Sequence, residues 1–369
     1  MWGLLPPSAT MHIPDGYLSP STCAALYVGA GVGWYGALRR VRRALTTRLI
    51  PLISVFAAFS FVVMMFNLPL PGGTTGHAIG VTIAAIILGP SGAILAISIA
   101  IAIQALFFGD GGVTTLGANC FNMAIIGSLV AYATYRLVAA RAAITSRRRV
   151  MAAAIAGYLA ANAAAFVAAV EFGIQPVLFH DARGVPLYAP YSLNVAVPAM
   201  MIGHLLVAGI AESVIAAGLV AYLQVADPSL LRSTSGLPAG AASVAELVPQ
   251  KSLRKLWITV ALLMLLTPLG ILAGGTAWGE WSANQVNAAA INKEIPAAKQ
   301  NQSQPDSAPV GLQRLSSLWT APIPNYAPQF VKSPSFGYLL SAMFGVGLLM
   351  AFSLALQRVL QGRRTAGQP

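Results

Sequence analysis

Long uncharged apolar runs, separated by short polar or basic segments, make up most of the chain. The longest, from Leu49 to Gly109, has 61 residues without Asp, Glu, Lys or Arg. A helix rises about 1.5 Å per residue and the apolar core of a membrane is about 30 Å thick, so this run holds material for three crossings. A Pro- and Gly-rich loop at 68–76 and a Gly-Pro-Ser-Gly turn at 89–92 divide it. We therefore predict helices at about 51–68, 77–89 and 92–108.

Each of the other uncharged runs supports one further span. These runs are 20–38, 111–135, 150–170, 184–211, 256–279 and 333–357. The pattern predicts an all-α polytopic membrane protein with a seven-span bundle and two further transmembrane helices. Treating 77–108 as one kinked helix would leave eight spans in place of nine.

The basic residues favour the nine-span interpretation. Only with nine spans do the cluster at 39–48 and the cluster at 136–149 fall on one side of the membrane, as the positive-inside rule requires. That arrangement places 17 of the 22 Lys and Arg residues inside, and only Arg183, Lys293, Lys299, Arg314 and Lys332 outside. The N-terminus is then outside and the C-terminus inside.

The amino-acid composition excludes several classes of protein. The chain is 57% hydrophobic and 9% charged, with a mean hydropathy of +0.71, which excludes a secreted enzyme and a DNA-binding protein. The net charge of +12 is then loop charge that orients the chain. The sequence contains no G-x-x-x-x-G-K-[ST], so it has no phosphate-binding loop of an ATPase. Cys23 and Cys120 lie in apolar stretches, and we expect both to be free thiols.

Histidine is the residue type most relevant to chemistry here. The topology puts His12 just before the first span and His77 at the outer start of the third, so the two can meet. A histidine in such a loop can also be a solvated side chain. If translation starts at Met11, however, the free amine, the His12 amide and an imidazole nitrogen form a fused chelate. Nitrogen ligands in a square plane suit Ni(II) or Cu(II), and Co(II) less well.

Several sequence stretches carry a specific family resemblance. They are Met11-His-Ile-Pro-Asp-Gly-Tyr-Leu-Ser19, Pro71-Gly-Gly-Thr-Thr-Gly-His-Ala78, Gln104-Ala-Leu-Phe-Phe-Gly-Asp-Gly-Gly112, Leu116-Gly-Ala-Asn-Cys-Phe-Asn-Met123 and Gly203-His-Leu-Leu-Val-Ala-Gly-Ile-Ala-Glu212. Through them, residues 11–223 closely resemble the M component (CbiM/NikM) of the cobalt and nickel energy-coupling-factor transporters. The resemblance implies that the amine of Met11, the amide and imidazole of His12, and the imidazole of His77 bind the metal.

The same resemblance implies the rest of the transport system. This chain would be the substrate-binding subunit of a nickel or cobalt importer in the inner (plasma) membrane, with the ion as cargo and no cofactor. A separate transmembrane coupling subunit and two cytoplasmic ATPase subunits would supply the energy. Residues 1–10 depart from the pattern, because retaining them would turn the amine of Met11 into a peptide bond. They lack a basic region and a cleavage motif, so we expect a misassigned start rather than a signal peptide.

The C-terminal part resembles a second, smaller component. A linker at 224–255, rich in Ser, Gly, Ala and Pro, precedes it. Residues 256–369 resemble the two-span N component that accompanies M proteins, through Pro268–Trp281 and Trp319–Tyr326, with an external loop at 275–335. This resemblance assigns no ligand.

Other polar residues leave alternatives open. Asp110, Asn119 and Asn122 are candidates either to orient His12 or His77 or to cap loops and helices. His204 and Glu212 lie on one helical face, which indicates either a helix–helix hydrogen bond or the proton-linked path of a self-sufficient secondary carrier.

A membrane enzyme with a metal-activated water is a third class of function. It needs a general base in the site, and Asp15 follows a proline that we expect to turn it away. We expect His180 and Asp181 to be solvated. Gly29, Gly33 and Ala37 share one face of the first span and predict close helix packing there.

Overall fold

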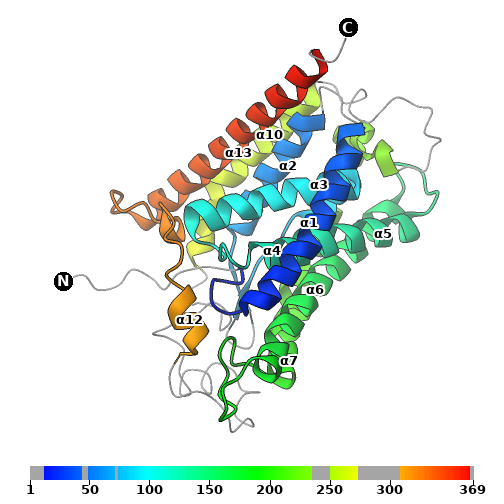
Figure 1. The fold of residues 1–369 in the computed structure, drawn as a ribbon. Helices are drawn as coiled ribbons and strands as arrows, with labels where there is room; N and C mark the ends of the chain where they lie inside the picture. Colours follow the sequence, from blue (N-terminus) through cyan, green and yellow to red (C-terminus); the bar gives the residue numbers. More distant parts are fainter. Residues whose placement is uncertain (1–11, 44–48, 71–73, 235–249, 273–307, 366–369) are drawn as a thin grey trace.

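The computed structural model describes residues 12–43, 49–70, 74–234, 250–272 and 308–365. Within these residues the regular secondary structure is helical apart from one short hairpin (Figure 1). The elements of the first part are α1 (Pro20–Arg43), α2 (Leu49–Met64), β1 (Leu68–Leu70), β2 (Thr74–Gly76), α3 (Val81–Ile103), the π-helix η1 (Gln104–Phe108), α4 (Leu116–Asn119), the π-helix η2 (Cys120–Ile126), α5 (Gly127–Ala139), α6 (Arg147–Leu178), α7 (Leu193–Gly203), the π-helix η3 (His204–Ala208) and α8 (Gly209–Ala226). The later elements are η4 (Pro228–Thr234), α10 (Gln250–Leu266), η5 (Thr267–Leu272), α12 (Val310–Leu315), η7 (Pro324–Tyr326) and α13 (Pro334–Thr365).

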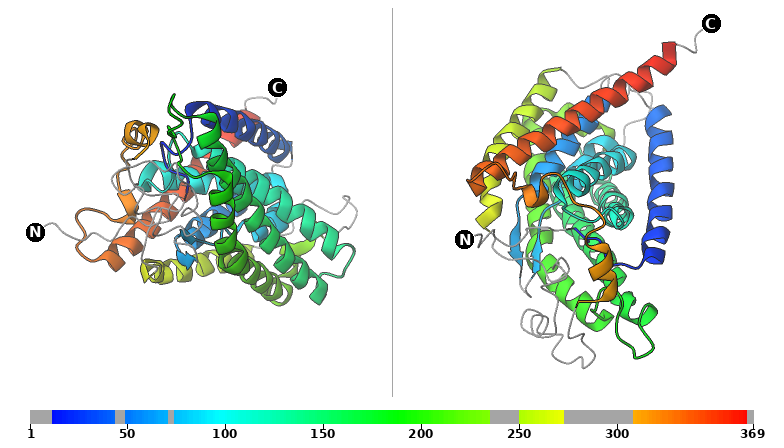
Figure 2. Two further views of the ribbon diagram at one scale, coloured as in Figure 1. Left: turned by 90° about the horizontal axis from the view of Figure 1, so that it is seen from below. Right: turned by 60° about the vertical axis from the view of Figure 1, so that its left-hand side comes forward.

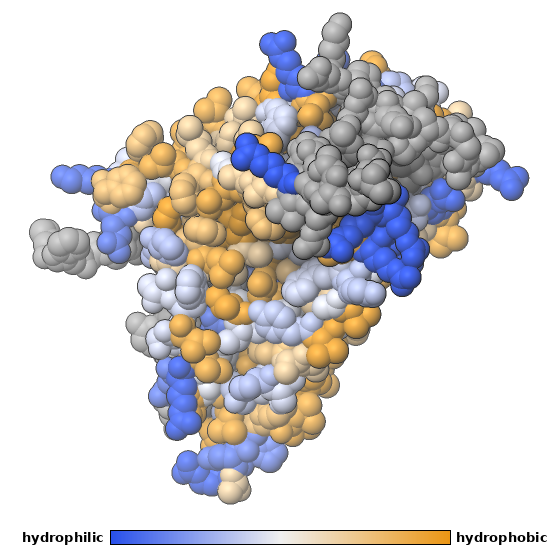
Figure 3. All heavy atoms as spheres, turned by 45° about the horizontal axis from the view of Figure 1, so that its top comes forward, coloured by the Kyte–Doolittle hydropathy of each residue, from blue (hydrophilic) through white to orange (hydrophobic). Residues whose placement is uncertain are grey.

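The helices have the lengths and surfaces of a membrane protein. Six described helical runs are long and apolar enough to cross a membrane: Val81–Phe108, Leu116–Ala139, Arg147–Leu178, Leu193–Ala226, Leu253–Ile271 and Pro334–Ala355. The shorter α2 is apolar and almost wholly buried. Large hydrophobic side chains such as Val28, Val32 and Leu262 are exposed, and orange hydrophobic atoms cover much of the face in Figure 3. The protein is thus a multi-pass membrane protein. The number of crossings and their orientation stay predictions.

The chain reverses direction within the run Val81–Phe108. A straight helix of these 28 residues would be about 42 Å long, yet His77 before it and Asp110 after it both lie beside His12. The reversal is at Gly89, whose φ of 72° and ψ of 169° are not helical, and Pro90 follows directly. Pro90 and Ser91 line the same hollow as Arg39, at the opposite end of α1 from His12. The predicted turn at 89–92 is therefore present, although the first arm begins at Val81 and residues 77–80 are not helical.

The helices differ from the uncharged runs in their bounds. The run at 184–211 corresponds to the helical run Leu193–Ala226, which continues past Glu212 because backbone amides at the start of α3 satisfy its carboxylate. In the run at 111–135 the helix begins at Leu116, because the residues before it contact the N-terminal segment. The loop predicted at 68–76 includes strands β1 and β2, paired antiparallel with Leu68 opposite Gly76. Residues 71–73, residues 235–249 of the linker and the external loop up to 307 lie outside the described residues.

Close packing of α1 occurs where the small residues predicted it. A Cβ added at Gly33 would lie 2.4 Å from Cδ1 of Ile125, and one at Gly29 would lie 3.2 Å from the ring of Phe121. Both partners belong to η2, so small residues allow α1 to approach this helix. The C-terminal helices α10 and α13 pack against α2 on the flank away from α1 (Figure 2).

Glu212 of α8 fixes the start of α3. Its carboxylate accepts hydrogen bonds from the backbone amides of Ile79 (2.8 Å), Gly80 (2.8 Å) and Thr82 (3.1 Å), and the residue is fully buried. The first amides of a helix lack intrahelical partners, and a carboxylate there also interacts favourably with the helix dipole. The predicted helix–helix hydrogen bond is in fact a cap on another helix, directly after His77.

We predict that Glu212→Gln destabilises this packing. The amide group of Gln presents a donor to three donors, so at least one amide loses its acceptor, at a cost of about 1–3 kcal/mol. The thermal unfolding midpoint, followed by circular dichroism in detergent, should fall. Asp181→Asn is a matched control, because Asp181 also accepts backbone amides, of Arg183 and Val185, but in an exposed loop. Equal midpoints for both variants and the wild type would show that Glu212 is not an anchor.

Candidate metal centre

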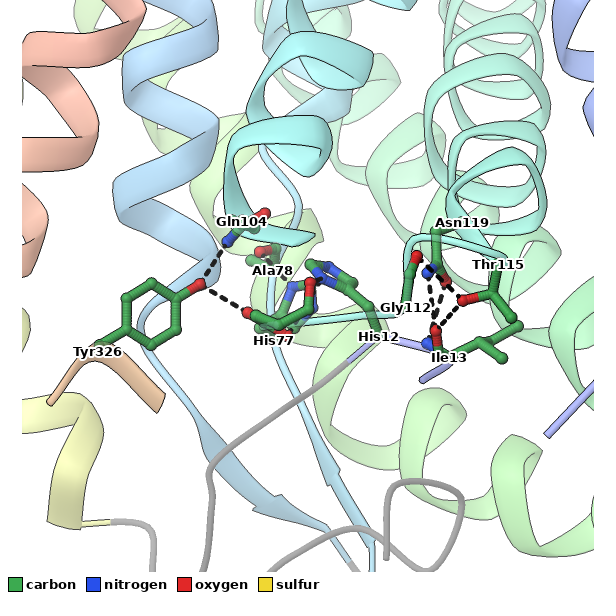
Figure 4. A network of polar contacts seen from close by, with 10 residues as sticks. His12, Ile13, His77, Ala78, Gln104, Gly112, Thr115, Asn119 and Tyr326 are labelled. Atoms are coloured by element: carbon green, nitrogen blue, oxygen red, sulfur yellow. Dashed lines mark hydrogen bonds and ion pairs between the residues drawn. The ribbon is translucent and has the colours of Figure 1, made fainter. Parts of the chain in front are cut away.

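The two histidines that the sequence singles out lie together. The rings of His12 and His77 have their centroids 5.2 Å apart and are nearly perpendicular, at 86°. Both residues are buried, with 2% and 8% of their surface exposed. Figure 4 shows them converging from two chain segments, the stretch before α1 and the stretch between β2 and α3. Met11, the third predicted ligand residue, lies outside the described residues.

The backbone beside His12 is held on both sides. Ile13 donates its amide to Oδ1 of Asn119 (3.0 Å). Its carbonyl accepts hydrogen bonds from Nδ2 of Asn119 (3.0 Å), the amide of Gly112 (3.0 Å) and the hydroxyl of Thr115. These contacts tie the N-terminal segment to the loop between η1 and α4 and thereby set the position of His12 (Figure 4).

Asp15 also holds this loop. Its carboxylate accepts the amides of Val113 (3.1 Å) and Thr114 (2.7 Å) and the Thr114 hydroxyl. Glycine is required where the two segments touch. A Cβ at Gly111, whose φ is +88°, would lie 2.8 Å from Cβ of His12, and one at Gly112 would lie 2.3 Å from the amide of Asp15.

Asp110 orients the ring of His12. Nδ1 of His12 lies 3.2 Å from Oδ1 of Asp110 and 3.3 Å from its carbonyl oxygen, while Nε2 is buried and has no hydrogen-bond partner in the part of the chain that the structure describes. Because both neighbours of Nδ1 accept, Nδ1 carries a proton and the lone pair of the neutral ring is on Nε2. Burial lowers the pKa of His12, but the charge and hydrogen bonds of Asp110 together raise it above the ordinary value.

His77 is kept neutral. Its Nδ1 lies 2.9 Å from the carbonyl oxygen of Ala78, so Nδ1 donates and Nε2 keeps the lone pair. Burial, with a contribution from the nearby His12, lowers the pKa of His77 to about 3. A neutral imidazole with a fixed tautomer is the form that binds a transition metal.

The other candidate residues are placed as follows. Asn119 contacts the backbone next to His12, whereas Asn122 donates to Oε2 of Glu171 (2.8 Å) inside the bundle. His204 bonds the carbonyl of Met200 within its own helix, and His180 is exposed in its loop. Cys23 and Cys120 are free and buried. Among the described residues no three or more His, Cys, Asp or Glu side chains form a metal-binding group, so these side chains alone do not complete a site.

No role was predicted for Tyr326 and Gln104, two residues at the centre. Tyr326, from the C-terminal part, donates its hydroxyl to Oδ2 of Asp110 (2.6 Å) and accepts from Nε2 of Gln104 (3.1 Å) (Figure 4). Both residues belong to stretches that carry the family resemblance, which was the only available signal. Glu171 ended a predicted span and received no role, although it is buried.

Comparisons with known proteins agree with this architecture. Residues 12–230 match the family model CbiM, described as the cobalt uptake substrate-specific transmembrane region, and residues 254–362 match the PDGLE domain. The chain is 52% identical to the fused nickel transport protein NikMN of Rhodobacter capsulatus, over 92% of this chain and 95% of that protein. It is 42% identical to the probable fused nickel transport protein LarMN of Lactiplantibacillus plantarum, over 75% and 79%.

A solved structure also resembles this chain. It is described as a truncated transition metal transporter, is 50% identical, and superimposes with a TM-score of 0.55 over 58% of this chain and 98% of that one. The matched relatives are transport proteins. The chain therefore belongs to the CbiM family of nickel and cobalt transport proteins, in the form in which this region is fused to a PDGLE domain.

Proposed function

We propose that this chain is the substrate-capturing subunit of an ATP-driven importer and that it binds Ni(II) or Co(II) between His12 and His77. The observation that carries the proposal is the pair of buried, perpendicular imidazoles 5.2 Å apart, contributed by two separate segments. Among the described residues, one buried ring nitrogen, Nε2 of His12, has no hydrogen-bond partner, and burying such a group without one is costly. A metal ion bound at Nδ1, with Nε2 turned toward Asp110, would give both ring nitrogens of His12 a partner.

The amine of Met11 and the amide of His12 complete the proposed ligand set. A chelate that uses the His12 amide closes through Nδ1, because that ring nitrogen is the one nearer the backbone. Nδ1 now lies beside Asp110, so the chelate requires a half-turn of the ring about Cβ–Cγ. The half-turn exchanges the two edges of the ring. Nε2 then lies on the edge that faces the carboxylate of Asp110. A histidine ligand held by a carboxylate is a common arrangement at metal sites.

The importer also requires partner subunits. We propose a transmembrane coupling subunit and two cytoplasmic ATPase subunits, since this sequence has no phosphate-binding loop.

A self-sufficient secondary carrier is less well supported. The carboxylate of Glu212 is occupied by three backbone amides, and His204 bonds within its own helix. A hydrolytic enzyme is also less well supported, because Asp15 holds a loop and offers no general base.

Substitution of the histidines tests the ligand set. His12→Ala removes an imidazole and a chelate ring, so we expect Ni(II) binding to be abolished. His77→Ala should weaken it by more than about 100-fold, the upper range for losing only an outer partner of a metal ligand. Equilibrium dialysis of purified protein with radioactive nickel measures both. His180→Ala is the control, because His180 is exposed and should bind normally. Wild-type binding by both site variants would place the metal elsewhere.

Affinity should fall with acidification. Protons compete with the metal for the lone pairs of the amine, amide and imidazoles. His77, with a pKa of about 3, stays neutral, whereas His12 has a raised pKa and protonates at a higher pH than a solvated histidine. Binding is therefore strongest above the pKa of His12 and weakens as the pH drops through it. Nickel titrations between about pH 8 and about pH 5 measure this, and a constant affinity over that interval would contradict the assignment.

A further inference from the structure

A segment of the C-terminal part lies directly against the candidate metal centre. The indole of Trp319 donates to the carbonyl of Leu106 (3.0 Å), and the amide of Ile323 donates to the carbonyl of Phe107 (3.0 Å). Both carbonyls belong to the end of η1, where a helix leaves such groups without intrahelical partners. The segment 319–326 thus supplies hydrogen-bond donors to carbonyls at the end of η1.

The hydroxyl of Tyr326 continues this contact into the site. It accepts from Gln104 (3.1 Å) and donates to Oδ2 of Asp110 (2.6 Å), while Oδ1 of Asp110 lies 3.2 Å from Nδ1 of His12. All four residues are at most 2% exposed. Hydrogen bonds that are shielded from water in this way are stronger and fix geometry better than exposed ones. One carboxylate oxygen of Asp110 therefore contacts the imidazole of His12, and the other accepts the hydroxyl of Tyr326.

The position of Tyr326 is fixed by its backbone conformation and by contacts with its neighbours. Asn325 and Tyr326 both have a φ of +57°, a left-handed conformation that is unusual for a bulky side chain and persists only where neighbouring contacts enforce it. The ring of Tyr326 stacks on Phe108 at 4.7 Å and 20°. Its carbonyl accepts the hydroxyl of Ser341 (2.9 Å), from α13. The C-terminal part thus holds the phenol against Asp110.

We propose that Tyr326 is a positioning residue for the metal site: its hydroxyl fixes the carboxylate of Asp110, which holds the His12 ring through Nδ1 in the metal-free protein and through Nε2 once the ring has turned to bind the metal. Metal capture would then depend on a residue of the PDGLE domain. The inference rests on the proposed function of His12 as a ligand. While one oxygen of Asp110 accepts from Tyr326, the other is directed at the imidazole of His12; without that hydrogen bond the carboxylate has more freedom to rotate. Loss of an outer partner of a metal ligand typically lowers affinity about 10–100-fold.

Two tyrosine variants separate positioning from packing. Tyr326→Phe removes the hydroxyl and keeps the ring. Tyr338→Phe makes the same chemical change next to it, with its ring centroid 5.4 Å from that of Tyr326, but its hydroxyl donates to the carbonyl of Met65. We expect Ni(II), added as the chloride to full-length protein in lipid nanodiscs, to bind about 10–100-fold more weakly to Tyr326→Phe and unchanged to Tyr338→Phe. The unfolding midpoints of the metal-free proteins check that both variants are folded.

A double-mutant cycle tests whether the effect passes through Asp110. If it does, Tyr326→Phe adds little loss of affinity to Asp110→Asn, whereas independent effects multiply. Multiplicative effects, equal losses in the two tyrosine variants, or wild-type affinity of Tyr326→Phe would each overturn the inference. Wild-type affinity of Tyr326→Phe beside lost binding in His12→Ala would overturn it while leaving the proposed function intact. Normal binding by His12→Ala would instead reject the proposed function.

Discussion

The site depends on irregular backbone being buried inside a helical bundle, where every polar group needs a protein partner. The residues before α1, before α3 and after η1 are not helical, and they meet between the helices. With little water available, unpaired amides and carbonyls there would be costly. Asn119 pairs with the backbone of Ile13, and Glu212 pairs with three amides after His77. The positions of both imidazoles are consequently set by side chains from other helices.

Part of this arrangement could be predicted from the sequence. The meeting of His12 and His77 followed from the nine-span topology, and the reversal between them followed from a Gly-Pro pair in an uncharged run. The position of Glu212 could not be predicted, because a rule that ends a span at the first charge ignores the amides that a buried carboxylate can satisfy. The contact of Tyr326 with Asp110 joins residues 216 positions apart, and no local pattern reports such a contact.

The proposed ligand set agrees with the metals named for the family. Imidazole, amine and amide nitrogens suit nickel, copper and cobalt, while Mg(II) and Ca(II) prefer oxygen ligands. The nearest carboxylate, Asp110, faces the imidazole of His12 with one oxygen and the phenol of Tyr326 with the other. Asp110 is therefore placed to orient the His12 ring. A square-planar set of four nitrogens favours Ni(II) over Co(II), which is more often tetrahedral or octahedral.

X-ray absorption at the nickel edge reports directly on the ligands of the bound metal. The sample is nickel-loaded protein that starts at Met11, compared with protein that keeps residues 1–10. We expect a four-coordinate, square-planar spectrum with nitrogen neighbours and the outer-shell scattering of two imidazoles in the first sample, and loss of that signature in the second. A six-coordinate spectrum dominated by oxygen, without imidazole scattering, or identical spectra from the two samples, would contradict the four-nitrogen site.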